Sequence, residues 1–186
     1  MSFSKDNEKT VYERYLDRCR DDYQLDLTLS FDMPAGYENA NGTFDVTSGT
    51  VFINAERLRD APDYEKAFYL FHEFRHALQH LRPDLFDSAI RRSIQYVITY
   101  DGTCYKMIDN EYRECKLEGG EEYFTDLYLG QPHEVDANTF AYEKVREIFG
   151  DFEDLSRLYE FWMPRRPVAK GSYDAVFAGI DELVND

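Results

Sequence analysis

The chain has 186 residues and a formal net charge of −16. This length suits one domain with a sizeable core, and a hydrophobic content of 43% with 16% aromatic residues excludes a disordered chain. The negative charge argues against direct binding of nucleic acid or of an anionic membrane surface. It favours a basic partner or substrate, unless the excess acid serves solubility alone.

The cysteine count and the first residues indicate the compartment. The three cysteines, Cys19, Cys104 and Cys115, are odd in number and match neither a disulfide framework nor a zinc knuckle. Cys104 and Cys115 are expected to approach each other as reduced thiols. The start, MSFSKDNEKT, lacks the apolar run of a signal peptide, and no stretch reaches the length of a membrane span. We therefore expect a cytoplasmic protein with a single domain over residues 1–186.

The first third of the chain predicts one helix and three strands. Residues 5–23 carry apolar side chains on one helical face, and residues 25–31 alternate as in a strand. Residues 43–54 predict two short strands around Ser48-Gly49. The second of these, residues 50–54, comes just before the longest predicted helix, and the sequence permits it to form the edge of a cleft beside that helix.

Residues 63–81 predict a long amphipathic helix, because they contain neither glycine nor proline between Pro62 and Pro83. Its predicted apolar stripe consists of Ala67, Leu70, Phe71, Phe74, Ala77, Leu78 and Leu81. The helix should bury this stripe and turn His72 and His76 toward a cleft.

The rest of the chain mixes both kinds of element, so the predicted fold class is α+β. A short helix is expected at 87–92, a hairpin at 94–108 with Asp101-Gly102 as its turn, and a strand at 111–117. Three further helices are expected at 133–149, 152–161 and 172–184.

The motif His72-Glu73-Phe74-Arg75-His76 carries the chemistry. Four residues span about one helical turn, so His72 and His76 project from one face and can hold one divalent metal. Glu73 then lies beside the metal, where it can take a proton from water as a general base. The alternative is an amphipathic helix with surface histidines.

A catalytic zinc site usually takes three protein ligands, so a third must come from elsewhere. The candidates are His80, His133, Glu134 and Asp136. Pro132 suits the first position of a helix and places Glu134 in its first turn. Asn138, four residues later, shares that face and can orient a ligand histidine, and His80 fits such a supporting place better than direct ligation. Zinc suits a histidine and carboxylate set, as do manganese, iron and nickel.

The segments VFIN, FHEFRHALQH and PHEVDANTFA together resemble the ImmA/IrrE-type zinc-dependent metallopeptidases. The likeness covers residues 50–81 and 131–142. It implies a gluzincin-like, zincin-type fold, with a small mixed or antiparallel sheet packed on the motif helix. It also implies Zn²⁺ bound by His72, His76 and Glu134, with Glu73 as the general base.

The resemblance further implies a narrow-range intracellular substrate. Members of that family are often encoded by phages and mobile elements, and several cut or inactivate DNA-binding repressors. Three features differ here: Arg75 replaces a small residue, the stretch 77–133 is long, and Tyr142-Glu143-Lys144 replaces an apolar stretch. Arg75 is a candidate to bind a substrate carboxylate.

The expected reaction is hydrolysis of a peptide bond in a protein or peptide substrate. The transition state needs a hydrogen-bond donor for its oxyanion, and Tyr142, Tyr128 and Arg75 are candidates. The alternative from another functional class is a catalytically silent, zinc-containing binding module, such as an antirepressor or immunity-type protein. An intact Glu73 favours the enzyme, because a structural metal site has no use for a base. Hydrolysis of a non-peptide amide is a third possibility.

Overall fold

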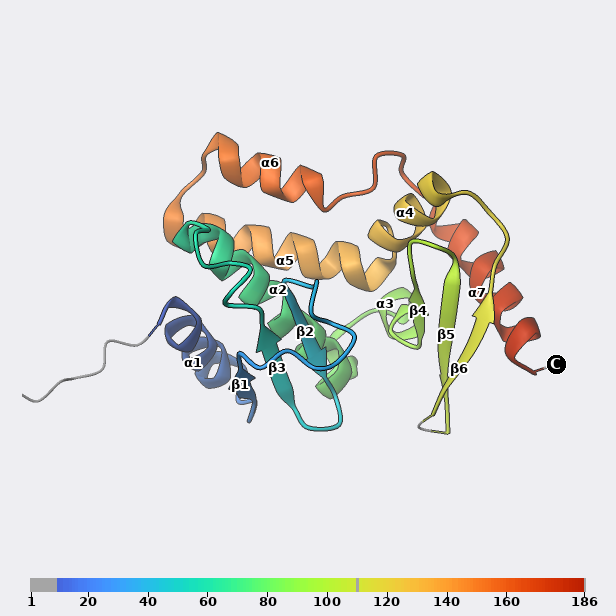
Figure 1. Cartoon of the computed structure of the whole chain (residues 1–186), viewed down its shortest axis with the longest axis horizontal. Helices are drawn as coiled ribbons and strands as arrows, with labels where there is room; N and C mark the ends of the chain where they lie inside the picture. The colour runs from blue at the N-terminus through green and yellow to red at the C-terminus, as the bar shows by residue number, and fades with distance from the viewer. Residues whose placement is uncertain (1–9, 110, 186) are drawn as a thin grey trace, which may run out of the picture.

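The computed structural model describes residues 10–109 and 111–185, and the fold is α+β as expected (Figure 1). The helices are α1 (Val11–Tyr23), α2 (Asp63–Leu81), η1 (Pro83–Leu85), α3 (Ser88–Ser93), α4 (Glu121–Leu129), α5 (Pro132–Phe149), α6 (Glu153–Phe161) and α7 (Lys170–Asn185). The strands are β1 (Thr28–Ser30), β2 (Gly42–Asp45), β3 (Thr50–Ile53), β4 (Tyr96–Ile98), β5 (Thr103–Ile108) and β6 (Glu111–Lys116). The predicted helix 5–23 begins at Val11, where Thr10 and Glu13 form a capping box, and residues 5–9 lie outside the described part.

Helix α2 is the element on which the larger core is built. It covers the predicted residues 63–81, and the predicted stripe is buried from Ala67 to Leu78. Leu81 is the exception, since it is exposed at the last turn of the helix. Helices α1 and α5 pack against α2, and fully buried Ala137 and Ala141 allow α5 to approach closely. No helix in the described part of the chain is long and apolar enough to cross a bilayer.

A three-stranded sheet with the order β1-β3-β2 covers another side of α2. Strand β3 pairs in parallel with β1 and antiparallel with β2. Residues 50–54 therefore do not form the cleft edge that the sequence permitted, because β3 is the middle strand and β2 is the edge beside α2. The reason is that β1 pairs with the far side of β3, a contact that sequence order does not reveal.

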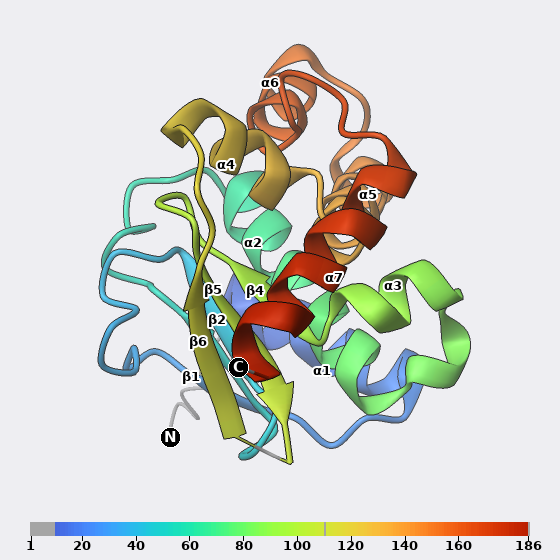
Figure 2. The same cartoon turned by 90° about the vertical axis from the view of Figure 1, so that its right-hand side faces the viewer.

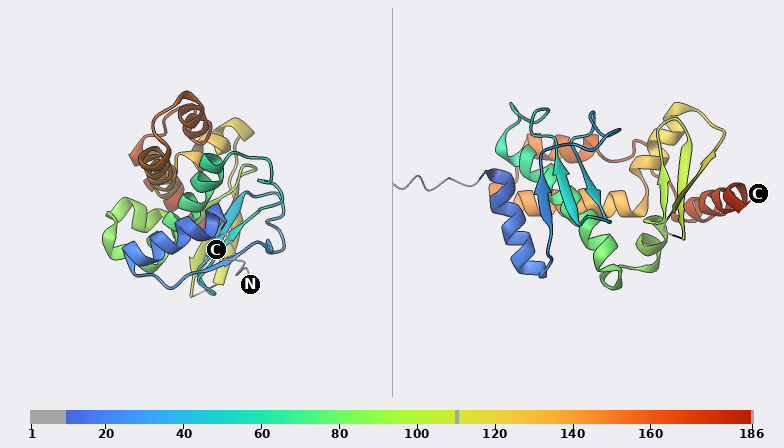
Figure 3. Two further views of the ribbon diagram at one scale, coloured as in Figure 1. Left: turned by 90° about the vertical axis from the view of Figure 1, so that its left-hand side faces the viewer. Right: turned by 60° about the horizontal axis from the view of Figure 1, so that its bottom comes forward.

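The long stretch after α2 builds a second sheet, with the order β4-β5-β6. Figure 2 shows α7 lying across one face of this sheet, where Tyr173, Phe177 and Ile180 enter a second buried cluster with Phe124 and Leu127 of α4. Helix α4 was absent from the sequence-based prediction. The other face of the sheet looks toward β2 (Figure 3, right).

The predicted hairpin at 94–108 forms, and Cys104 lies opposite Cys115 on the next strand, as expected of the two thiols. Its turn differs from the predicted two-residue loop. The Gly102 N–H donates to the Thr99 carbonyl at 3.0 Å, so Tyr100 and Asp101 are the central residues. Gly102 follows with a φ of +82°, in the left-handed region that favours glycine.

We expect Gly102→Ala to destabilise the protein more than Gly36→Ala. Both glycines have positive φ, but a Cβ at Gly102 would lie 2.5 Å from the Phe124 ring, whereas Gly36 faces open space. The conformational cost is about 1–2 kcal/mol at each site, and the clash adds to it only at Gly102. Urea unfolding measures both variants, and equal losses of unfolding free energy would contradict the packing argument.

A candidate metal centre

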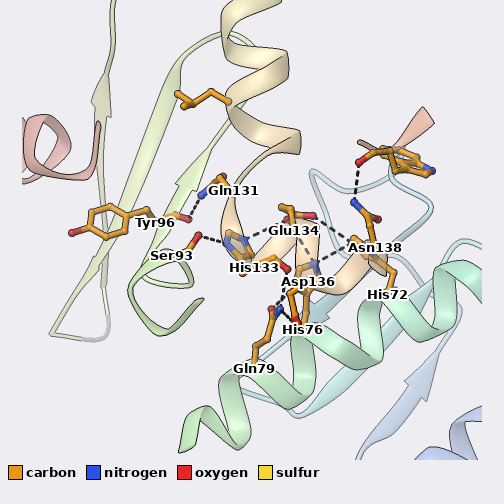
Figure 4. Close-up of polar contacts among 12 residues, drawn as sticks. His72, His76, Gln79, Ser93, Tyr96, Gln131, His133, Glu134, Asp136 and Asn138 are labelled. Carbon is orange, nitrogen blue, oxygen red and sulfur yellow. Dashed lines mark hydrogen bonds and ion pairs between the residues drawn. The ribbon is translucent and has the colours of Figure 1, made fainter. Parts of the chain in front are cut away.

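Helices α2 and α5 bring three side chains to one point, as Figure 4 shows. The ligand atoms of His72, His76 and Glu134 all lie within 4.8 Å of one another, and this group can hold a metal ion. The two histidine Nε2 atoms are 3.0 Å apart. His72 Nε2 lies 3.5 Å from Glu134 Oε2, and His76 Nε2 lies 3.6 Å from Glu134 Oε1.

These separations are close to those of a tetrahedral metal site. Metal–ligand bonds of about 2.0–2.1 Å give a ligand-to-ligand edge of about 3.3 Å in a tetrahedron. The two histidine nitrogens lie slightly closer together than this value, and each lies slightly farther than this value from a different oxygen of the Glu134 carboxylate. The sequence-based choice of Glu134 as the third member of the group agrees with this geometry.

The charges of the group suit a bound cation. Burial alone would lower the pKa of His76, but the Glu134 carboxylate raises it to about 9. Burial in turn would raise the pKa of Glu134, yet the His76 charge holds that pKa well below its usual range. The buried carboxylate is thus compensated by a proton on His76, and a divalent cation would compensate it in the same place.

His72 differs from His76 in its charge, because its surroundings favour the neutral imidazole. Burial, followed by the charge of His76, lowers the pKa of His72 to about 4. Asn138 lies next to His72 and opposes this lowering of its pKa, while Asn138 Nδ2 donates to the Trp162 carbonyl at 3.0 Å. His72 Nδ1 and Asn138 Oδ1 are both buried without a well-formed partner among the described residues. A cation on His72 Nε2 would fix the proton on Nδ1, which is the donor that Asn138 Oδ1 needs.

Gln79 supports His76, a role that the sequence analysis did not assign. Its Oε1 lies 2.9 Å from His76 Nδ1, and its Nε2 donates to Asp136 Oδ2 at 2.8 Å. Arg75 donates two further hydrogen bonds to the Asp136 carboxylate, at 2.7 and 2.9 Å. Asp136, an alternative third ligand, therefore serves to hold Gln79 and Arg75. The sequence could have indicated this contact, because Gln79 follows His76 by three residues and therefore shares its helical face.

The other two histidines lie in the same region. His133 Nε2 is 3.4 Å from Glu134 Oε1, and its Nδ1 is 2.6 Å from Ser93 Oγ, so it contacts the carboxylate from outside the three-residue group. His80 packs near the Phe44 ring at 6.2 Å between centroids. No hydrogen bond joins His80 to a member of the group in the described part of the chain, and the expected supporting role falls to Gln79 instead.

Glu73 is buried beside the group, and burial raises its pKa to about 7. Strand β2 closes over it at Gly42. A Cβ at Gly42 would lie 2.7 Å from Glu73 Cγ and 3.0 Å from the Phe52 carbonyl. Only a glycine leaves this space, so β2 and the Glu73 side chain are fitted to each other.

Two cavities open on either side of the three-residue group, and both are lined by His72, Glu73 and Glu134. The first, of about 280 Å³, extends toward the start of α2 and is called the Trp162 cavity. The second, of about 680 Å³, extends toward the end of α2 and is called the Phe44 cavity. Val97, Tyr105 and Tyr112 of the second sheet line the Phe44 cavity opposite β2.

Of the three predicted oxyanion donors, the structure brings only Tyr128 to the cavities. Tyr128 of α4 lines both of them, and Tyr100 lies against it at 4.7 Å between ring centroids. Tyr142 instead stacks on Tyr159 at 4.6 Å, outside both cavities. Arg75 is also outside them, held by Asp136 and covered by rings. These positions correct the choice of Tyr142 and the substrate-binding role expected of Arg75.

No family model, curated protein or solved structure matches the chain. The assignment of chemistry therefore depends on the arrangement of the side chains themselves.

We expect Gln79→Ala to weaken the binding of a divalent metal and His80→Ala to leave it unchanged. Removing Gln79 frees the His76 ring to rotate, and loss of such a supporting bond typically costs about 10- to 100-fold in metal affinity. Competition with a chelator of known affinity measures both variants. Equal affinities for wild type and Gln79→Ala would show that the contact does not support the metal site.

Proposed function

We propose that the protein is a zinc-dependent peptidase that hydrolyses a peptide bond in an extended segment of a protein substrate. The observation that carries this proposal is the position of Glu73. It is a buried carboxylate with a raised pKa, next to a group that can hold a metal, in the wall of two cavities. A site that only stabilised the fold would need neither the open cavities nor this carboxylate.

A zinc ion, when bound, would polarise the peptide carbonyl and acidify a water molecule. Glu73 accepts the proton of the attacking water at its carboxylate and passes it to the departing nitrogen. Burial suits both transfers, because it raises the pKa of Glu73 to about 7, near the operating pH. Tyr128 donates its hydroxyl proton in a hydrogen bond to the carbonyl oxygen as negative charge develops there.

Strand β2 supplies a place for the substrate backbone. Asn54 N–H donates to the Asn41 carbonyl, so in this antiparallel ladder Asn41 and Thr43 turn their backbone groups toward β3. Gly42 and Phe44 then turn theirs outward, because the two kinds of residue alternate. An extended peptide can pair with this free edge beside Glu73. The tyrosines of the second sheet form the opposite wall.

The resemblance to ImmA/IrrE-type peptidases adds the class of substrate. A DNA-binding repressor is basic and would be attracted to a chain with a net charge of −16. The zincin-type fold and the cytoplasmic location are part of the same proposal.

We expect Glu73→Gln to abolish hydrolysis while zinc binding is retained. The amide keeps the size of the side chain but cannot take the proton, and general acid–base catalysis typically contributes about 100- to 10,000-fold. Cleavage of a quenched-fluorescent peptide library by zinc-loaded protein measures turnover, with Glu65→Gln on the same helix as the control. Full turnover in Glu73→Gln would remove Glu73 as the base. Stoichiometric zinc in a wild type that cleaves nothing would favour the binding module instead.

We expect Tyr128→Phe to lower kcat by about 100-fold with a smaller effect on KM, because its hydrogen bond forms mainly in the transition state. Tyr123→Phe on the same helix is the control, since Tyr123 is exposed and outside both cavities. Steady-state kinetics on the best library peptide separates the two constants. A rise in KM alone would assign Tyr128 to substrate binding.

A further inference from the structure

Arg57 places a positive charge in the wall of the Trp162 cavity, next to a centre that is otherwise acidic. Its side chain is exposed, and no carboxylate lies within ion-pair distance of it in the described part of the chain. Its Nε donates to Asn41 Oδ1 at 2.8 Å, which fixes the plane of the guanidinium. The two terminal nitrogens keep their donors for a ligand.

The segment around Arg57 is held in place by a buried asparagine. Asn54 Nδ2 donates to the carbonyls of Glu38 and Ala40, at 2.9 and 3.1 Å. Asn54 Oδ1 accepts from the Arg57 backbone N–H at 3.1 Å. These bonds tie the loop before β2 to the loop after β3, so the position of Arg57 relative to the edge strand is set by the fold.

The Trp162 cavity lies along the first half of α2. Phe68 and Tyr69 line only this cavity, whereas His76 and His80 line only the Phe44 cavity. Tyr69 lies about one helical turn before the three-residue group, a rise of about 5 Å. An extended chain advances about 3.3 Å per residue, so this part of the cleft has room for one or two residues beyond the reacting bond.

The direction of the substrate follows from β2. Asn41 lines only the Trp162 cavity, Gly42 lines both cavities, and Phe44 lines only the Phe44 cavity, so β2 runs from the first cavity to the second. A peptide that pairs antiparallel to β2 therefore runs from the Phe44 cavity to the Trp162 cavity. Its C-terminal side enters the cavity that contains Arg57.

We propose that Arg57 binds the C-terminal carboxylate of the substrate, so that the protein releases one or two residues from the end of a polypeptide. This proposal builds on the peptidase function above. A guanidinium offers a planar pair of donors that matches a carboxylate. A parallel substrate would instead bring an amino terminus to Arg57, and the two positive charges would repel each other.

The lining of the cavity indicates the residue that it accepts. Phe68, Tyr69 and Trp162 provide aromatic surface, and Trp162 Nε1 already donates to the Tyr69 hydroxyl at 3.3 Å. An aromatic or large apolar side chain next to the terminal carboxylate fits this lining.

Calorimetric titration with acetyl-glycyl-phenylalanine and with its C-terminal amide tests the proposal without any need for turnover. We expect metal-free wild type and zinc-loaded Glu73→Gln, neither of which hydrolyses the ligand, to bind the acid about 10- to 100-fold more tightly than the amide, the ratio that one charge-assisted bond supplies. Arg57→Gln should remove this preference and Arg57→Lys restore part of it. Arg59→Gln should leave it intact, because Arg59 pairs with Glu56 and lies outside both cavities. Equal binding of acid and amide, or an unchanged preference in Arg57→Gln, would overturn the proposal.

Cleavage assays with zinc-loaded protein then separate this proposal from the peptidase function. Peptides with a free C-terminal carboxylate should be cut near that end, and their amides should show a KM raised about 10-fold or more. If binding depends on Arg57 but no peptide is cleaved, the carboxylate site is supported and the proposed peptidase function is wrong. A further control is a peptide amide that carries an aspartate near its C-terminus. If this amide is cut as fast as the free acid, and if the cutting depends on Arg57, then Arg57 binds a side-chain carboxylate and the proposed specificity for a chain terminus is wrong.

Discussion

The structure depends on one buried charge. Packing α5 against α2 largely buries the Glu134 carboxylate between two imidazoles, and a nearby positive charge offsets the cost of burying it. A proton on His76 can supply this positive charge, because the Glu134 carboxylate raises the pKa of His76 against the effect of burial. The remaining polar network, from Gln79 to Asp136, orients the ring that carries this charge.

The second sheet gives this centre its cleft. The chain between α2 and α5 folds into β4–β6 and α4, and α7 covers the back of that sheet so that its front faces β2. The added elements bring Tyr100 and Tyr128 to the same cavities as Glu73. The long stretch 77–133 therefore builds the wall of a cavity opposite the edge strand β2.

The spacing of residues along the chain predicted those features that depend on neighbouring positions in the sequence. The motif helix, the pairing of His72 with His76 and the hairpin after α3 follow from the periods of a helix or a strand. The choice of Glu134 came instead from its place after Pro132 and from the family resemblance. Features set by the packing of distant segments were missed. Helix α4 is short, so it gives little periodic signal. Strand β3 is the middle strand because β1 pairs with it. The salt bridge that holds Arg75 away from the cavities joins it to Asp136, which lies far away in the sequence.

Zinc content measured by elemental analysis tests the central claim most directly, on wild type, Glu134→Ala and Glu143→Ala after reconstitution and removal of free metal. Glu143 is exposed on the same helix as Glu134, so its variant controls for changes in α5 itself. The account predicts about one zinc ion per chain in wild type and in Glu143→Ala. It predicts none in Glu134→Ala, because two histidines alone do not retain the ion. A wild type without zinc, or a Glu134→Ala variant that keeps it, would contradict the account.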